Sequence, residues 1–228
     1  MFKIYNKSSE NMDEIPNNFI NLIIAGPPYN IGTKYGEFND SLSHKNYIFL
    51  MNKIFSECFR VLRLDGRMII EVADSVYIGG NYIQLAGLIQ KICLDIGFNL
   101  ESRHISFVRV KNHTEIPEHD WKQDYTTKKN AHSNCHQYLI LTKKKVGWKD
   151  GTMFYTNYIS KEGHPCPFPK ETTDFILKKY FNKGCSVLDP FMGTASLGVE
   201  VLKRGGVFYG YEVVKDFYKT ASKKLGSF

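Results

Sequence analysis

The chain has 228 residues, with 30 Lys and Arg against 23 Asp and Glu, and a formal net charge of +7. This length corresponds to one domain, and a hydrophobic content of 43% with 23% charged residues is that of a globular rather than a disordered protein. The sequence has no apolar run long enough to span a membrane, no evident secretory signal and no CxxC pair, so we expect a reduced cytoplasmic protein without a structural zinc site.

Strand and helix patterns alternate along the chain. The apolar run Ile20–Ala25 predicts a buried strand that ends where the prolines begin. Apolar residues at helical spacing follow over Tyr47–Leu64 and Tyr82–Ile96, with a strand over Met68–Ala73 between them. The remaining predicted strands are Ser106–Val110, Gln137–Thr142, Ser186–Leu188 and Val207–Tyr211, and the remaining helices are Thr172–Phe181 and Leu197–Arg204. The alternation predicts an α/β domain with a mostly parallel sheet.

Positive charge is concentrated between Arg103 and Lys145, where nine Lys and Arg face four Asp and Glu. Within this region Lys111–Asn134 has little apolar periodicity, which predicts a long loop or a small inserted subdomain. The residues alone leave two interpretations open: a solvated surface excursion, or a basic arm that contacts phosphates. Five of the seven histidines also lie between Arg103 and Lys145, but no pair has the spacing of a metal site, so we expect none.

The strand Ser186–Leu188 runs into a turn of mostly small residues that leads to a helix, Asp189-Pro190-Phe191-Met192-Gly193-Thr194-Ala195-Ser196. Such a turn lets backbone N–H groups approach a ligand closely. Further along, the strand Val207–Tyr211 ends at Glu212, and a carboxylate there can accept hydrogen bonds from both hydroxyls of a ribose. Because GxGxxG and GxxxxGK[ST] are absent, these two features favour a nucleoside-containing ligand other than a dinucleotide or a nucleoside triphosphate.

A second unusual strand end is Gly26-Pro27-Pro28-Tyr29. Consecutive prolines form a rigid corner in which one carbonyl can face a pocket as a fixed hydrogen-bond acceptor. Tyr29 supplies a flat face on which a base can stack. Ligands of open α/β sheets bind beyond the carboxyl ends of the strands, so we expect both strand ends to contribute to one site.

These motifs resemble those of the S-adenosylmethionine-dependent DNA amino-methyltransferases of bacterial restriction–modification systems. Gly26–Tyr29 is similar to their (Asp/Asn/Ser)-Pro-Pro-Tyr catalytic motif, and Glu212 is similar to the acid that holds the cofactor ribose. His164–Pro169 resembles the HPxxxP stretch that precedes the cofactor loop, and Asp189–Ser196 resembles that loop. The catalytic motif precedes the cofactor loop, which is the permuted order of the β group. The resemblance extends over about Ile20 to Leu225.

The resemblance implies a Rossmann-like methyltransferase fold in permuted order, with a mostly parallel seven-stranded sheet and helices on both faces. Residues 1–228 then form a single domain, with 111–134 as an inserted target-recognition segment. The implied cofactor is S-adenosylmethionine and the implied partner is double-stranded DNA, with no membrane; a cognate restriction endonuclease and a homodimer are left open. The implied cofactor-binding residues are Asp189, Pro190, Phe191, Met192, Gly193, Thr194, Ala195, Ser196, Glu212, His164 and Pro165. The implied catalytic residues are Gly26, Pro27, Pro28 and Tyr29, and the implied DNA-binding residues are Lys111, Trp121, Lys122, Lys128 and Lys129.

The motifs indicate the reaction more specifically than they indicate the target atom. Pro-Pro-Tyr-Asn-Ile-Gly and His-Pro-x-Pro-Phe-Pro resemble the cytosine-N4 branch, so we expect cytosine N4, with adenine N6 as the alternative. Position 26 departs from the family, because glycine has no side chain to accept a hydrogen bond from the target amino group. The chain is then an inactive variant that binds DNA and cofactor, a slow enzyme that relies on the Pro27 carbonyl, or an enzyme in which a neighbour such as Asn30 substitutes. A second departure is Lys7-Ser8, where relatives often carry an acid that contacts the cofactor adenine.

Overall fold

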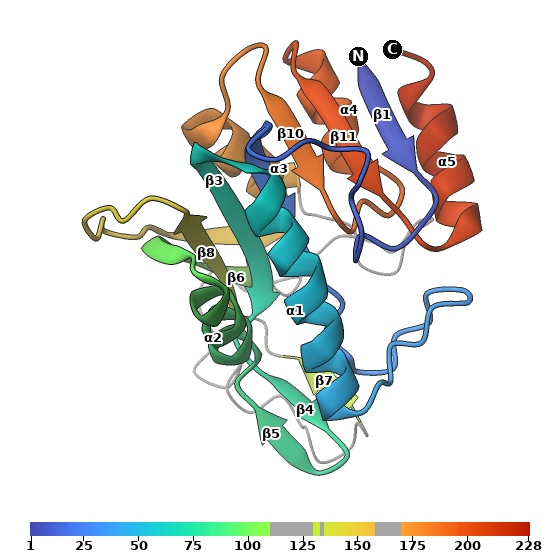
Figure 1. The fold of residues 1–228 in the computed structure, drawn as a ribbon. Helices are drawn as coiled ribbons and strands as arrows, with labels where there is room; N and C mark the ends of the chain where they lie inside the picture. Colours follow the sequence, from blue (N-terminus) through green and yellow to red (C-terminus); the bar gives the residue numbers. More distant parts are fainter. Residues whose placement is uncertain (110–129, 133–134, 158–169) are drawn as a thin grey trace.

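A computed structural model of the protein describes residues 1–109, 130–132, 135–157 and 170–228. It contains an eight-stranded sheet in the order β1-β11-β10-β2-β3-β8-β6-β9 and a three-stranded sheet in the order β5-β4-β7 (Figure 1). The strands are β1 (Phe2–Tyr5), β2 (Ile20–Ala25), β3 (Leu62–Ala73), β4 (Val76–Ile78), β5 (Asn81–Ile83), β6 (Asn99–Arg109), β7 (Asn130–His132), β8 (Cys135–Thr142), β9 (Met153–Asn157), β10 (Ser186–Asp189) and β11 (Val207–Tyr211). The helices are α1 (His44–Val61), α2 (Leu85–Ile96), α3 (Lys170–Tyr180), α4 (Ser196–Lys203) and α5 (Lys215–Leu225).

The large sheet is mostly parallel, as predicted. Neighbouring strands from β1 through β11, β10 and β2 to β3 are all parallel, and β9 is parallel to β6. In this sheet β8 alone runs against the others, because it pairs antiparallel with both β3 and β6. The expected count of seven strands is wrong, since the sheet has eight. The edge strands β1 and β9 have at most three consecutive apolar or aromatic residues, and the sequence pattern does not reveal them.

Helices cover both faces of the sheet, as predicted (Figure 1). The face of β2 that carries Ile23 and Ala25 packs in one apolar cluster with buried residues of α1 and α2. The opposite face, which carries Leu22 and Ile24, packs with residues of α3, α4 and α5. Side chains on a strand alternate between faces, so a fully apolar run such as β2 serves two cores at once.

Several predicted boundaries move. Helix α1 ends at Val61 rather than Leu64, because β3 already begins at Leu62 rather than Met68. Two starts move for local reasons. Helix α1 begins at His44 rather than Tyr47, because the Ser43 side chain accepts a hydrogen bond from the Asn46 N–H and caps the first turn. The predicted helix from Tyr82 instead begins at Leu85, because Asn81–Ile83 pairs with β4 as a hairpin. Gly79 and Gly80 both have positive φ in the two-residue turn, a conformation that favours glycine.

The carboxyl ends of β2, β3, β10 and β11 lie along one edge of the large sheet (Figure 1). The small sheet lies beyond the end of β3 and includes β7, so part of the predicted 111–134 loop is a strand. The described helices include none whose length and apolar character would let it cross a membrane.

A buried histidine joins β6 to α3. His104 is fully buried; its Nδ1 accepts a hydrogen bond from the Thr152 N–H at 2.8 Å, and its Nε2 lies 2.7 Å from the Tyr180 hydroxyl. The acceptor role of Nδ1 requires the neutral ring to carry its proton on Nε2. Burial, with the nearby Lys179, lowers the pKa of His104 to about 4.

We predict that His104 makes the fold sensitive to acid. Between pH 6.5 and 4 the unfolded chain binds a proton at this site that the folded chain does not, so stability falls as the pH falls through that window. From pH 7 to pH 5 the loss attributable to His104 is about 2 kcal/mol, measured by urea denaturation at each pH. His104→Gln should flatten this dependence, whereas the exposed control His44→Gln should leave it unchanged; equal slopes in both variants would contradict the prediction.

Candidate functional site

The predicted ligand loop begins with a buried carboxyl group. Asp189 is the last residue of β10, has only 3% of its surface exposed, and accepts a hydrogen bond from the Phe191 N–H at 2.9 Å. Burial raises the pKa of Asp189 to about 7, and the negative charge of Glu212 contributes to the rise. With a pKa of about 7, this carboxyl group is half ionised near neutral pH. Because burial keeps water away from its negative charge, a positively charged ligand would stabilise the ionised form.

Glu212 ties the loop to the end of β11. Its Oε2 accepts a hydrogen bond from the Gly193 N–H at 2.9 Å, and its Oε1 accepts one from the Val214 N–H at 2.7 Å. Burial raises the pKa of Glu212 despite these bonds. Each carboxylate oxygen retains a second lone pair, so both oxygens remain able to accept from ligand hydroxyls.

The loop between Asp189 and α4 has a backbone that few residues adopt. Gly193 and Ala195 both have positive φ, at 53° and 57°, and Ala195 is the residue that precedes α4. Met192 packs so closely on Gly210 that a Cβ at position 210 would lie 2.4 Å from the Met192 sulfur. The loop from Asp189 to Ser196 is therefore held tightly against β11 at Met192 and Gly193, and Gly193 joins it to Glu212.

A segment that sequence reasoning did not include braces the loop from outside. The Asn6 side chain donates to the Glu212 carbonyl at 2.8 Å, and the Ser9 hydroxyl donates to the Pro190 carbonyl at 2.9 Å. Lys7, which belongs to the second departure from the family pattern, forms an ion pair with Glu14 at 2.8 Å. The isolated polar residues Asn6 and Ser9 carry no motif, so only their spatial position reveals their role.

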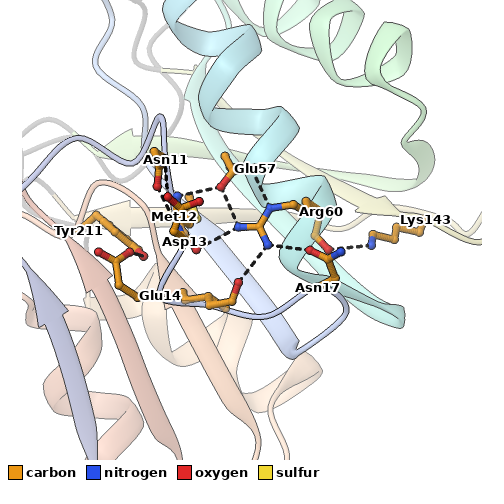
Figure 2. Close-up of polar contacts among 10 residues, drawn as sticks. Asn11, Met12, Asp13, Glu14, Asn17, Glu57, Arg60, Lys143 and Tyr211 are labelled. Carbon is orange, nitrogen blue, oxygen red and sulfur yellow. Dashed lines mark hydrogen bonds and ion pairs between the residues drawn. The ribbon is translucent and has the colours of Figure 1, made fainter.

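The same segment is anchored to α1 through one arginine (Figure 2). The Arg60 guanidinium donates to the carbonyls of Met12 and Ile15, at 2.9 and 3.0 Å, and to the Asn17 side chain at 2.7 Å. Glu57, one turn earlier on α1, pairs with Arg60 and accepts a hydrogen bond from the Met12 N–H at 2.7 Å. The guanidinium thus orders the chain between β1 and β2, which in turn positions Ser9 against the loop.

The proline corner at the end of β2 is rigid. The Tyr47 hydroxyl of α1 donates to the Pro28 carbonyl at 2.9 Å, which fixes the corner on α1. Within the described part of the chain, no hydrogen bond ends on the Pro27 carbonyl. Tyr29 is partly buried and meets the ring of His136 on β8 edge-on, with the ring centroids 6.2 Å apart.

The loop after the corner is closed on itself. Asn30 has a φ of 60°, and its side chain both donates to the Leu42 carbonyl at 2.9 Å and accepts from the Leu42 N–H at 2.7 Å. Asp40 accepts hydrogen bonds from the N–H groups of Asn30, Ile31 and Thr33, and burial raises its pKa. The structure therefore does not support Asn30 as the substitute acceptor for position 26, because both polar atoms of its side chain already hold this loop.

Several predicted site residues lie outside the described residues. These are the cofactor-loop neighbours His164 and Pro165 and the DNA-binding candidates Lys111, Trp121, Lys122, Lys128 and Lys129. In the described ranges, no group of three or more His, Cys, Asp or Glu side chains is arranged to hold a metal ion.

Comparison with known proteins identifies the family. The N6/N4 methyltransferase family model, described as DNA methylase, matches residues 20–223. The chain belongs to the DNA methylase family. Members of this family are S-adenosylmethionine-dependent amino-methyltransferases that act on DNA, which agrees with the resemblance of the motifs.

Relatives of this DNA methylase match it over nearly its whole length. Type II methyltransferase M.HpaI of Haemophilus parainfluenzae is 26% identical over 97% of this chain and 72% of its own length. Type II methyltransferase M.BglII of Bacillus subtilis is 25% identical, with 98% and 68% covered. DNA adenine methyltransferase YhdJ of Escherichia coli is 24% identical, with 97% and 81% covered.

Solved structures share the fold at lower identity. The TTHA0409 protein of Thermus thermophilus, complexed with S-adenosyl-L-methionine, has a TM-score of 0.72 at 17% identity, and the match covers 100% of this chain and 96% of that one. The PvuII cytosine-N4 DNA methyltransferase has a TM-score of 0.74 at 14% identity, covering 98% and 86%. These likenesses confirm the Rossmann-like methyltransferase fold of this DNA methylase.

The described residues fit the cofactor of the family. S-Adenosylmethionine carries positive charge on its sulfonium and amino groups, and the buried Asp189 and Glu212 carboxyls supply negative charge on neighbouring strands. The free second lone pairs of Glu212 suit ribose hydroxyls, and the strained loop leads directly into the start of α4, where backbone N–H groups favour an anionic group.

We predict that the Asp189 carboxyl group reduces the stability of the cofactor-free DNA methylase above neutral pH. Its pKa is raised from 3.8 to about 7, so the folded chain holds a proton that the unfolded chain releases, and stability is lost as the pH rises through that window. Asp189→Asn, which keeps the acceptor for Phe191, should raise the unfolding free energy at pH 8 by up to roughly 4 kcal/mol at about 1.36 kcal/mol per pKa unit.

The measurement is urea denaturation without cofactor, at pH 5 and pH 8. The exposed control Asp150→Asn should change neither value. If Asp189→Asn had the same unfolding free energy at pH 8 as the wild-type chain, the buried carboxyl group would not be the cause of the loss of stability at that pH.

Proposed function

We propose that this DNA methylase transfers a methyl group from S-adenosylmethionine to the exocyclic amino nitrogen of a base within a short specific DNA site. The observation that carries the proposal is the pairing of β2 with β10, in which Leu22 lies opposite Val187 and Ile23 opposite Leu188. This pairing brings the proline corner and the cofactor loop to one edge of the sheet, so that donor and acceptor of the methyl group can meet there.

Each residue of the site has a role in the proposal. The cofactor supplies an electrophilic methyl group on a sulfonium. Glu212 holds the ribose, and Asp189 with the loop that follows binds the rest of the cofactor. The base leaves the duplex because its amino group is otherwise paired and inaccessible, and it stacks on Tyr29. The Pro27 carbonyl accepts a hydrogen bond from the amino group and so orients the nitrogen lone pair.

Cytosine N4 is the favoured target atom. The supporting features are Pro-Pro-Tyr-Asn-Ile-Gly after β2 and the His-Pro-x-Pro-Phe-Pro stretch at 164–169, which resemble the cytosine-N4 branch of the family. Adenine N6 is the second candidate, because one relative is named a DNA adenine methyltransferase. Nucleoside analysis of methylated DNA distinguishes N4-methylcytosine from N6-methyladenine directly.

The competing hypothesis is a binding module that keeps DNA and cofactor affinity but transfers no methyl group, because Gly26 lacks an acceptor. The test is incorporation of labelled methyl groups into mixed-sequence DNA by the wild-type chain and by Gly26→Ser and Gly26→Asp. Methylation by the wild-type chain supports the enzyme. If all three bind the cofactor and none methylates any DNA, the binding module is the correct interpretation.

We predict that the Tyr29 ring carries the contact with the base. Base stacking on an aromatic side chain contributes about 1–3 kcal/mol, so Tyr29→Ala should lower kcat/KM for DNA by roughly 5- to 150-fold. Tyr29→Phe keeps the ring and should stay within about threefold of wild type on the same stacking argument. Methyl transfer assays measure both, and cofactor affinity should not change in either variant. Equal losses in the two variants would assign the effect to the hydroxyl group instead.

We predict that the basic segment contacts DNA phosphates. Replacing Lys128 and Lys129 together with Gln should weaken DNA binding and reduce the slope of log affinity against log salt by about 2, because each phosphate contact contributes about 0.9. Fluorescence anisotropy at several salt concentrations measures this, and cofactor affinity should stay unchanged. Lys219→Gln with Lys223→Gln, on α5, is the charge-matched control. If the wild-type chain showed no salt-dependent DNA binding, a small-molecule methyltransferase would be favoured instead.

A further inference from the structure

Two buried ionisable side chains beside the proline corner have no role in the reaction as proposed above. Glu71 on β3 and His136 on β8 are 7% and 9% exposed, and His136 Nδ1 lies 2.5 Å from Glu71 Oε1. A buried carboxylate is costly unless it is paired and hydrogen-bonded. A buried pair of this kind at the edge where the ligands bind therefore requires an explanation.

The strand register brings Glu71 level with the residue that departs from the family. Ala25, the last residue of β2, is paired with Ile70 of β3, so Gly26 follows at the level of Glu71. Neighbouring strands lie about 4.8 Å apart, so a side chain at position 26 would begin about 5 Å from that of Glu71.

Both positions also face the same side of the sheet. On β3, Ile70 packs with the α1 and α2 cluster, whereas Ile69 packs with the cluster on the opposite face, and alternation assigns Glu71 to the face of Ile69. Tyr138, which lies opposite Glu71 on β8, belongs to that face as well. On β2 the corresponding residue is Ile24, so an extension of the strand by one step past Ala25 turns position 26 to the face of Glu71.

The pair also touches the residue proposed to hold the base. His136 lies edge-on against Tyr29 with the ring centroids 6.2 Å apart, so Glu71, His136 and Tyr29 form a continuous row at the carboxyl edge. The contact with His136 engages Glu71 Oε1, and a carboxylate has a second oxygen with its own lone pairs. One oxygen is thus oriented by the histidine, while the other can accept a hydrogen bond from a donor beyond the strand end.

We propose that the Glu71 carboxylate, oriented by His136, is the acceptor for the target amino group that Gly26 cannot provide. This inference rests on the proposed function. In the transfer, the amino nitrogen forms a bond to the methyl carbon as the sulfur–methyl bond breaks and the sulfur keeps that electron pair. The nitrogen then gives up one proton to the Glu71 carboxylate. The acceptor has moved from the end of β2 to the neighbouring strand, on the same face of the sheet.

Substitution of Glu71 tests the acceptor role. Glu71→Gln keeps the shape but removes the negative charge, and should lower kcat by about 10²–10³-fold, the cost of losing one positioned polar group in a transition state. The cofactor dissociation constant should change little, whereas the melting temperature should fall because the charge of a buried pair with His136 is removed. Where Glu71→Gln does not fold, Glu71→Asp serves, because it keeps the charge for His136 but withdraws it by one methylene; it should lose about tenfold or more.

Rescue distinguishes an acceptor from a structural residue. In the Glu71→Gln background, adding Gly26→Ser, Gly26→Asn or Gly26→Asp returns an acceptor to the neighbouring strand, and at least one should restore kcat by about tenfold or more. The matched control is Glu101→Gln, which removes the carboxylate of another buried ion pair, with Arg67 at 2.6 Å. That control should lower stability and leave the kcat of the folded protein unchanged.

The outcomes separate this inference from the proposed function. Methyl transfer by the wild-type chain, loss in Glu71→Gln and rescue at position 26 support both. Wild-type kcat in Glu71→Gln, or a loss that no substitution at position 26 rescues, overturns the acceptor role while the methyltransferase stands. Absence of methyl transfer by the wild-type chain on any DNA, with cofactor bound, overturns the proposed function and this inference together.

Discussion

The pairing of β2 with β10 is the contact on which the site depends. The two strands form a short parallel ladder. At its start, the Asn21 N–H donates to the Ser186 hydroxyl oxygen at 3.0 Å, and the Ser186 N–H and hydroxyl both donate to the Asn21 side-chain oxygen, at 3.0 and 2.9 Å. These two residues are 165 positions apart in the chain. Parallel strands end at the same edge, so this one seam brings the proline corner and the cofactor loop together. A shift of one residue in the register of this pairing would turn every side chain of β2 to the opposite face of the sheet, so that its apolar residues would leave the clusters in which they are buried.

The edge formed in this way is rich in buried acid. Asp189 and Glu212 end neighbouring strands with raised pKa values, and Glu71 lies buried two strands away from β10, on β3. Elsewhere the buried carboxylate of Glu101 pairs with Arg67 and Lys149, and its pKa falls to about 2. The contrast is physical: Glu101 is neutralised by cations of the fold, whereas in the described residues no lysine or arginine pairs with Asp189 or Glu212, and burial therefore raises the pKa of both.

Much of the fold followed from local patterns. Continuous apolar runs revealed the central strands β2, β10 and β11, and helical spacing revealed α1 to α4, because these elements each bury a face against the core. The lysine-rich helix α5 was missed although its buried residues Ala221 and Leu225 lie at helical spacing, and the edge strands β1 and β9 were missed because their pairing is decided by distant partners. The braces at Asn6 and Ser9 were missed for the same reason, as was the closed loop that occupies Asn30.

The sequence by itself determined the family and the order of its two motifs, because these depend on residue types that lie next to one another in the chain. Only the tertiary structure decided which groups from elsewhere reach them. Strand register brought Glu71 beside Gly26, and an antiparallel pairing brought His136 to both Glu71 and Tyr29. Register arises from hydrogen bonding between strands and from which faces must be buried, and neither is encoded in the local spacing of a motif.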